Sequence, residues 1–278
     1  MFLEIIKFII YSGLIVIISK YILVTTLRKL AENLNLKAKT VGNIAGYATS
    51  VPELLTIVTA SLSGLTGTSI YNILSSNVIN LIQYLGAGIL NKNISKLRNK
   101  AIIIDLVLVI ITILIPIFMI KANISLNIII VPIFIFLYII FRIINDKTHK
   151  KYLEFKEEVD DDSQKNTLIK TRNKKDVILN IVVLILTGIV LFFVGELLGN
   201  TLGNLCNTFG ISEVIIGILL GFITSIPELI TFFEAQRHHK NAENDMLGVV
   251  EATNNLLTSN ILNLFVIESI GILLISFK

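Results

Sequence analysis

Long runs of apolar residues dominate this chain and alternate with short polar segments. Eight of these runs are long enough to predict membrane-spanning helices, and they cover residues 2–24, 40–63, 68–90, 101–120, 124–144, 177–199, 211–235 and 246–276. About 20 apolar residues carry a helix across the hydrocarbon core, and the runs are too long and continuous for barrel strands. Because lipid offers no partner to unpaired backbone groups, the pattern predicts an all-α membrane protein with about eight transmembrane helices.

The composition agrees with a membrane protein. The chain is 54% hydrophobic and only 16% charged, with a mean hydropathy of +0.79, whereas a soluble domain carries about 25% charged residues. The one cysteine, Cys206, cannot form an intrachain disulfide. The first apolar run lacks a basic leader and a small-residue cleavage site, so we expect a retained helix and not a signal peptide.

Lysine and arginine collect in alternate connections between the predicted helices, at 25–39, 91–100, 145–176 and 236–245. Because positively charged loops stay in the cytoplasm, these four loops are predicted to be cytoplasmic and both termini extracellular, in a multi-pass protein of the cell membrane. The loop 145–176 is predicted to be a linker between a first membrane half, 1–144, and a second, 177–278. Its acidic run, 157–162, is more typical of a solvated linker than of a regulatory calcium-binding patch.

Two short motifs occur twice in the same order. The sequence TSVPEL at 49–54 recurs as TSIPEL at 224–229, and SNVINL at 76–81 recurs as SNILNL at 259–264. The first copy falls in the second and third predicted helices and the second copy in the seventh and eighth. Five crossings separate equivalent helices, and an odd number reverses their direction through the membrane. Inverted repeats with interrupted helices are typical of transporters, which bind their substrate between the repeats.

The residue types in these motifs indicate a cation site. Pro52 and Pro227 each remove a helical hydrogen bond, which is expected to free backbone carbonyls at 46–49 and 221–224. Glu53 and Glu228 supply charge, and a carboxylate in the bilayer costs at least about 2.5–3.5 kcal/mol, so a matched pair predicts a bound cation. The donors are all oxygens, which suits Ca²⁺ and Na⁺ and disfavours soft metals.

The partner helices carry polar stripes at helical spacing. One stripe consists of Asn72, Ser76 and Asn80, and the other of Glu251, Asn255, Ser259 and Asn263. Such stripes also serve as hydrogen-bonding contacts between membrane helices, but their association with the glutamate motifs favours a binding site.

At residues 40–90 and 211–265 the chain resembles the calcium/cation antiporter superfamily, specifically its sodium/calcium exchanger-like branch. Repeats of that family carry T-S-x-P-E followed by S-N-x-x-N or S-N-x-x-D. The resemblance implies two inverted α-repeats, and secondary antiport of Ca²⁺ against Na⁺ by alternating access at a midplane site. The first and sixth spans would move against the core that carries the site.

The family's ion ligands correspond to ten residues of this chain, among which Glu53 and Glu228 would bridge calcium. These ten are Thr49, Ser50, Glu53, Ser76, Asn80, Thr224, Ser225, Glu228, Ser259 and Asn263. Three stripe residues, Asn72, Glu251 and Asn255, are additional candidates.

The chain departs from the family pattern in three ways. Asn263 stands where some members have aspartate, Ser75 and Thr258 replace the glycine before Ser-Asn, and eight spans are expected where the family has ten, so the last two helices would be absent. We hypothesise that Glu251 supplies the missing carboxylate. The alternative is a glutamate at a helix end, paired with Arg237 or Lys240.

Other functions remain open at this stage. Exchange of Ca²⁺ coupled to H⁺ or K⁺ could use the same site, and a channel-like or non-transporting relative is the other alternative. No catalytic motif occurs in the predicted spans, so the chain is not expected to be an enzyme or to need a cofactor beyond the transported ions. The basic residues are juxtamembrane, which argues against nucleic acid as a partner. Asp105 is expected to be a surface-paired acid near the basic edge of its span.

Overall fold

Helices joined by short turns and loops make up the part of the chain that the computed structural model describes, residues 2–34, 36–153, 174–238 and 246–277. The first half contains α1 (Phe2–Ile18), the π-helix η1 (Ser19–Val24), α2 (Thr25–Asn33), α3 (Ala38–Thr49), α4 (Val51–Leu62), α5 (Thr66–Leu90), the short 3₁₀-helix η2 (Lys96–Arg98), α6 (Lys100–Lys121) and α7 (Ile130–Tyr152). The second half contains α9 (Lys174–Gly203), the π-helix η3 (Asn204–Thr208), α10 (Glu213–Thr224), α11 (Ile226–His238), α12 (Met246–Leu262), the π-helix η4 (Asn263–Ile267) and α13 (Glu268–Ser276). The predicted all-α class is confirmed.

Within the described residues, six helices are long and apolar enough to cross a membrane. They are Phe2–Leu27, Thr66–Leu90, Lys100–Lys121, Lys175–Thr208, Glu213–Arg237 and Met246–Ser276. Each coincides with one of the predicted spans. Large apolar side chains on α1, α7 and α9 face outward, as the lipid-facing surface of a membrane protein requires.

The other two predicted spans have more complex structures. The run 40–63 is divided into α3 and α4, each of 12 residues, which meet at Ser50 just before Pro52. The run 124–144 was predicted to be helical from its start, but α7 begins only at Ile130 and continues to Tyr152. The polar residues 145–152, assigned to the linker from the sequence, therefore extend this helix. The acidic run 157–162 lies outside the described residues.

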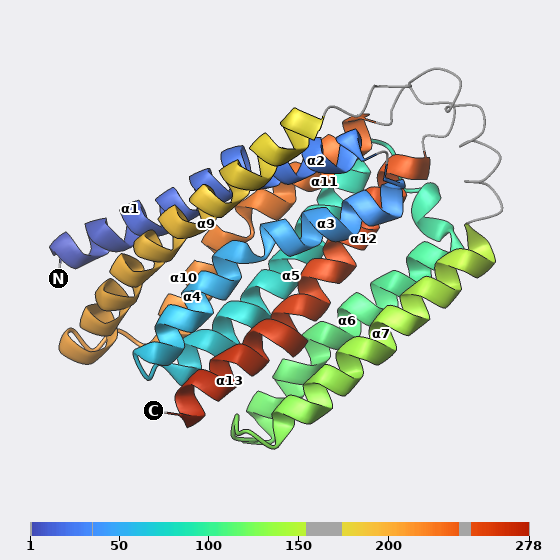
Figure 1. Cartoon of the computed structure of the whole chain (residues 1–278). Coiled ribbons are helices and arrows are strands. Elements are labelled where there is room, and N and C mark those ends of the chain that lie inside the picture. Colours follow the sequence, from blue (N-terminus) through green and yellow to red (C-terminus); the bar gives the residue numbers. More distant parts are fainter. Residues whose placement is uncertain (1, 35, 154–173, 239–245, 278) are drawn as a thin grey trace.

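The helices form a central group flanked on two sides (Figure 1). The centre consists of α3–α4, α5, α10–α11 and α12–α13. Helices α1 and α9 pack together on one flank, and α6 packs with α7 on the other. Both chain termini lie at one end of the bundle, whereas α7 ends and α9 begins at the opposite end (Figure 1).

Two hydrophobic clusters hold the flanks to the centre. Leu191, Leu198 and Leu202 of α9 pack with α1, α4 and α10 in one cluster. In the other, Phe265 makes edge-to-face contacts with two phenylalanines of α7, at 5.7 and 5.1 Å between ring centroids. The central helices are therefore clamped between two apolar layers.

The interrupted helices run in opposite directions and each crosses one of the polar-stripe helices (Figure 1). Gly46 and Gly221 make these crossings close. A Cβ atom at Gly46 would lie 2.8 Å from the Asn255 carbonyl oxygen, and one at Gly221 would lie 2.7 Å from the Asn72 carbonyl oxygen. Small residues allow this backbone approach between membrane helices, and it brings each glutamate motif against the stripe of the other repeat.

Candidate cation site

The two glutamates occupy equivalent positions just after the helix interruptions. Glu53 lies in the first turn of α4, and Glu228 in the first turn of α11. Proline is well tolerated at the start of a helix, where its missing N–H would have no intrahelical partner. The interruption therefore keeps two helical segments in line while the motif residues stand at the junction between them.

Fewer backbone carbonyls lack a hydrogen bond at the helix interruptions than the sequence indicated. The carbonyl oxygen of Gly46 accepts the Ser50 N–H at 3.2 Å and the Ser50 hydroxyl at 2.9 Å. The Gly221 carbonyl oxygen accepts the corresponding groups of Ser225 at 3.3 and 2.7 Å. These two carbonyls are therefore occupied by local hydrogen bonds, and the side-chain oxygens provide most of the remaining donors.

Both central carboxylates are fully buried and close enough to interact. The side chains of Glu53 and Glu228 are each 0% exposed, and the charge of Glu228 acts on Glu53. The threonines that begin the two motifs are buried as well, Thr49 at 0% and Thr224 at 1% exposed. Two acidic groups from opposite halves of the chain thus share one buried centre.

Serine hydroxyls connect the two repeats at this centre. Ser50 Oγ lies 3.0 Å from Ser259 Oγ, and the Ser259 hydroxyl donates to Glu228 Oε1 at 3.1 Å. On the other side, Asn263 Nδ2 donates to Ser76 Oγ at 3.4 Å and Asn80 Nδ2 donates to Ser259 Oγ at 3.5 Å. The sequence-predicted residues are therefore gathered in one place.

A set of buried oxygen atoms at this centre has no hydrogen-bond partner among the described residues. The set comprises both carboxylate oxygens of Glu53, Oε2 of Glu228, Oδ1 of Asn72, Asn80 and Asn263, and Oγ1 of Thr224. A buried acceptor without a donor costs about 1–3 kcal/mol, and more if it is charged. A hard cation would satisfy such oxygens together, so the donor set fits a cation.

Two asparagine side chains next to the site hold helices together and leave other amides as candidate ligands. Asn77 and Asn260, the asparagines that follow Ser76 and Ser259, donate reciprocally to each other's backbone carbonyls at 3.3 and 3.2 Å. They hold α5 against α12, whereas the carbonyl oxygens of Asn80 and Asn263 remain without partners. Helix contact is thus made by asparagines that lie beside the polar stripes, and the role of the stripe residues as ligands stays a prediction.

Two threonines that the sequence reading overlooked extend the symmetry. Thr56 donates to the carbonyl oxygen of Glu53 and accepts from Asn72 Nδ2, at 2.9 and 2.8 Å. Thr231 donates to the carbonyl oxygen of Glu228 at 2.9 Å and accepts from Asn255 Nδ2 at 2.5 Å. The signal was present in the sequence, because PELLT at 52–56 matches PELIT at 227–231.

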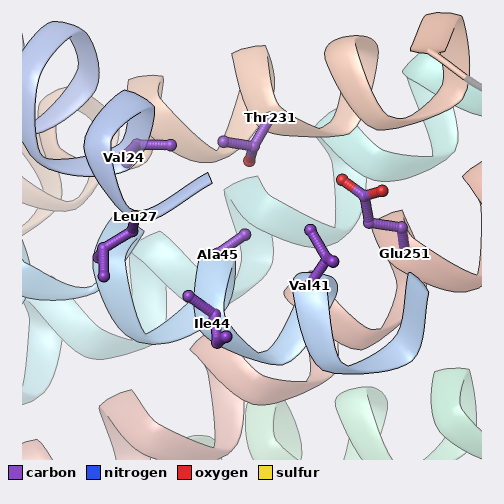
Figure 2. Close-up of a pocket in the computed structure, with 7 residues that line it drawn as sticks. All are labelled: Val24, Leu27, Val41, Ile44, Ala45, Thr231 and Glu251. Carbon is purple, nitrogen blue, oxygen red and sulfur yellow. The ribbon is translucent and has the colours of Figure 1, made fainter. Parts of the chain in front are cut away.

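Glu251 does not take the place of the missing acid. Twelve positions separate it from Asn263, which is about 18 Å along a helix. Glu251 is 4% exposed and lines a small pocket together with Thr231 (Figure 2). The hypothesis of direct replacement is therefore wrong, although Glu251 lies near the other end of the site.

The prediction for Asp105 is also wrong. Asp105 is 0% exposed, and its Oδ2 lies 2.7 Å from His149 Nε2 while Oδ1 accepts from Asn145 at 2.9 Å. Asn145 also donates to Asn254 Oδ1 at 3.3 Å, which connects α6 and α7 to α12. The error followed from the assignment of 145–176 to a linker, since both partners of Asp105 lie on the helical extension of α7.

The residue that replaces glycine before the second Ser-Asn motif has a structural role. Thr258 donates to Asn43 Oδ1 at 2.9 Å, and Arg142 Nη1 donates to Thr258 Oγ1 at 3.1 Å and to Asn43 Oδ1 at 3.2 Å. One arginine of α7 therefore fixes the crossing of α3 and α12 from outside.

A buried pair of carboxylates between oppositely directed, interrupted helices of a multi-pass bundle is typical of a membrane transporter for cations. The family model described as "Sodium/calcium exchanger protein" matches residues 5–145 and 179–278. The chain belongs to this family, and the expected relationship to cation antiporters is thereby confirmed. The protein is a multi-pass membrane antiporter and not an enzyme.

Solved structures of the sodium-calcium exchanger NCX_Mj share the fold. The form soaked with 10 mM Na⁺ and zero Ca²⁺ is 23% identical with a TM-score of 0.53, and the alignment covers 99% of this chain and 84% of that chain. The form soaked with 2.5 mM Na⁺ and 1 mM Sr²⁺ is 24% identical with a TM-score of 0.53, over 98% of this chain and 82% of that one. The comparison with curated proteins gave no match.

Proposed function

We propose that the protein exchanges Ca²⁺ for Na⁺ across the cell membrane by alternating access to the site between Glu53 and Glu228. The observation that carries this proposal is the pair of fully buried carboxylates whose oxygens largely lack hydrogen-bond donors. Each intramembrane carboxylate costs at least about 2.5–3.5 kcal/mol, and a bound cation offsets this cost. A purely structural bundle would gain nothing from two such groups.

The ligands divide into a bridging pair and flanking neutral oxygens. Glu53 and Glu228 would bridge Ca²⁺, while the hydroxyls of Thr49, Ser50, Thr224 and Ser225 and the side-chain oxygens of Ser76, Asn80, Ser259 and Asn263 would complete the Ca²⁺ shell and the Na⁺ positions. The two carboxylates carry two negative charges, which one Ca²⁺ or two Na⁺ would neutralise. Competition between the ions for these charges would couple their movements.

Exchange coupled to H⁺ or K⁺ is the second candidate. Asn263 stands where some family members carry an acid, so the titratable groups that we assign to the centre are the two glutamates. Two protons would neutralise this pair as completely as two Na⁺. Replacement of Na⁺ by K⁺, or by a pH gradient, separates these couplings.

The test is uptake of ⁴⁵Ca²⁺ into proteoliposomes under imposed Na⁺, K⁺ or pH gradients. We expect Na⁺-driven uptake by the wild-type protein and its loss in Glu53→Gln and Glu228→Gln, which keep the side-chain shape but remove the charge. Glu196→Gln is the matched control, because Glu196 is exposed on α9 and belongs to neither motif. Uptake that persists in both central variants, or that responds to no gradient, would reject the proposal.

The charge of the loops between the helices indicates how the chain is oriented in the membrane. We propose that the loops 25–39, 91–100, 145–176 and 236–245 face the cytoplasm, which is supported by their positive charge. Labelling of a cysteine introduced into loop 91–100 by an impermeant maleimide, in a Cys206→Ser background, would then require disruption of the membrane.

A further inference from the structure

A buried glutamate that neither motif contains lies at position 268. Its side chain is 1% exposed, and it begins α13, which leads to the C-terminal end of the chain (Figure 1). The offset of 183 positions that relates Ser76 to Ser259 places Leu85, which is 37% exposed, at the equivalent position of the first repeat. A carboxylate in the membrane costs at least about 2.5–3.5 kcal/mol, so its burial in one repeat alone indicates a role.

The π-helix η4 brings Glu268 onto the face of α12 that carries the site. This π-helix covers Asn263–Ile267, and the N–H of Glu268 donates to the carbonyl oxygen of Asn263. Such an i→i+5 bond returns the fifth residue to the face of the first, whereas five residues of an α-helix turn about 140° beyond a full turn. The equivalent stretch of α5, residues 80–85, is α-helical. Glu268 therefore lies in line with Asn263, within about 7.5 Å along the axis.

A serine of α5 extends the polar stripe of that helix as far as Glu268. The Ser69 hydroxyl donates to Glu268 Oε2 at 2.7 Å, a length typical of a hydrogen bond to an ionised carboxylate. Ser69, Asn72 and Ser76 follow one another at spacings of three and four, so they share one face of α5. Asn72 Oδ1 has no hydrogen-bond partner among the described residues. The seam between α5 and α12–α13 is thus polar from the centre to Glu268.

Neutral groups surround the Glu268 carboxylate. No lysine, arginine or histidine of the described residues forms an ion pair with it. The hydroxyls of Ser61 and Ser69 approach α13 at Gly271, where an added Cβ would lie 3.0 and 3.5 Å from their oxygens. Ser61 is fully buried, and its hydroxyl has no partner in the described part of the chain. The positive charge that would offset this carboxylate is therefore that of a cation held at the centre.

We propose that Glu268 is a selectivity-determining residue of the transport site, whose negative charge, one π-turn from Asn263, strengthens the binding of Ca²⁺ more than that of Na⁺. This inference rests on the proposed function. Glu268 acts on the bound ion through its electric field and is not one of the coordinating ligands. Ser69 fixes the carboxylate in the seam, and η4 gives it the correct face.

The charge of the ion sets the size of the effect. At an effective dielectric constant of about 20, a unit charge about 12 Å away changes the affinity for a monovalent ion about tenfold, and the interaction free energy is proportional to the charge of the ion. Removal of the Glu268 charge should therefore weaken Na⁺ binding about 3–10-fold and Ca²⁺ binding about 10–100-fold. The factor for Ca²⁺ should equal the square of the factor for Na⁺.

The test is the rise in Tm of the purified protein with CaCl₂ or NaCl, at constant ionic strength maintained with choline chloride. A ligand that binds the folded protein raises its stability according to concentration and Kd, so each titration yields an affinity without transport. Glu268→Gln keeps the side-chain shape and removes the charge, and it should show the two unequal losses. Glu268→Asp keeps the charge and should bind both ions within about threefold of wild type. Glu196→Gln, the control for an exposed charge on α9, should change neither affinity.

Each outcome decides the role of Glu268. Equal losses for Na⁺ and Ca²⁺ in Glu268→Gln would show that packing, and not charge, is responsible, and would overturn the proposal. Affinities in Glu268→Gln that match those of Glu196→Gln, or a Glu268→Asp variant as weak as Glu268→Gln, would overturn it as well. Absence of coupled flux in the wild-type protein would instead overturn the proposed function, and the two titrations would still measure the effect of Glu268 on cation binding.

Discussion

The substitution Gly221→Ala tests how closely the site depends on helix contact. In the structure, an added Cβ at this position would meet the Ser75 hydroxyl, and it would lie 2.7 Å from the Asn72 carbonyl oxygen and 2.8 Å from the Ser76 nitrogen. Two of these three atoms belong to the backbone of α5 and cannot rotate away. Because ordinary contacts begin at 3.4 Å, α10 and α5 must separate by about 0.7 Å, an overpacking of the kind that costs about 1–3 kcal/mol.

The control is Gly188→Ala on the exposed face of α9, where nothing lies within 4 Å of the added Cβ. At roughly 2–4 °C per kcal/mol for a chain of this size, we expect Gly221→Ala to lower the Tm of the purified protein by about 2–12 °C. Gly188→Ala should leave the Tm unchanged or raise it slightly, because alanine favours a helix over glycine by about 1 kcal/mol.

Transport and stability should fall together in Gly221→Ala, since α10 leads directly into Thr224 and Glu228. The affinity for Ca²⁺ should decrease in equilibrium ⁴⁵Ca²⁺ binding, while Gly188→Ala binds as the wild type does. If Gly221→Ala matches Gly188→Ala in both Tm and affinity, then the close crossing of α10 and α5 does not position the site and the reasoning is refuted.

Two other predictions follow from buried hydrogen bonds. Asp105→Asn should lower the free energy of unfolding by about 1–3 kcal/mol, because it replaces the buried carboxyl oxygen that lies 2.7 Å from His149 Nε2. Asp146→Asn, at a largely exposed ion pair, should cost no more than about 1 kcal/mol. Chemical denaturation in detergent measures both, and equal losses would contradict the burial argument. Thr56→Val and Thr231→Val should each weaken Ca²⁺ binding by about 2–10-fold, the equivalent of about 0.5–1.5 kcal/mol for one hydrogen bond. Equilibrium binding would refute the symmetric role of these two threonines if only one variant lost affinity.

Much of the fold was predictable because membrane helices are specified by long apolar runs. The paired motifs also indicated which helices must meet, since two carboxylates in lipid require a common ligand. The predicted helix boundaries were wrong where polar residues continue a helix. Residues 145–152 look like a linker by composition, yet Asn145 and His149 face Asp105 inside the bundle.

The hydrogen-bond assignments at the site could not be read from the sequence. Spacing places Asn77 and Asn80 on α5, but it does not say that one amide contacts the backbone of α12 while the other keeps a free oxygen. Those roles depend on the depth at which α5 and α12 cross. Each of these two helices also crosses an interrupted helix closely, α12 at Gly46 of α3 and α5 at Gly221 of α10, and such closeness is a tertiary property.

The match between the two halves of the site and its failure at Glu251 have separate consequences. The two halves match in residue type but not in hydrogen bonding, because Ser259 donates to Glu228 Oε1 whereas both carboxylate oxygens of Glu53 lack a donor among the described residues. Net flux is set by the ion gradients in either case, because a binding site shifts an equilibrium only by its differential affinity for two states. The match in residue type ends one helical turn beyond Asn255, where the second repeat has Glu251 and the first has Thr68.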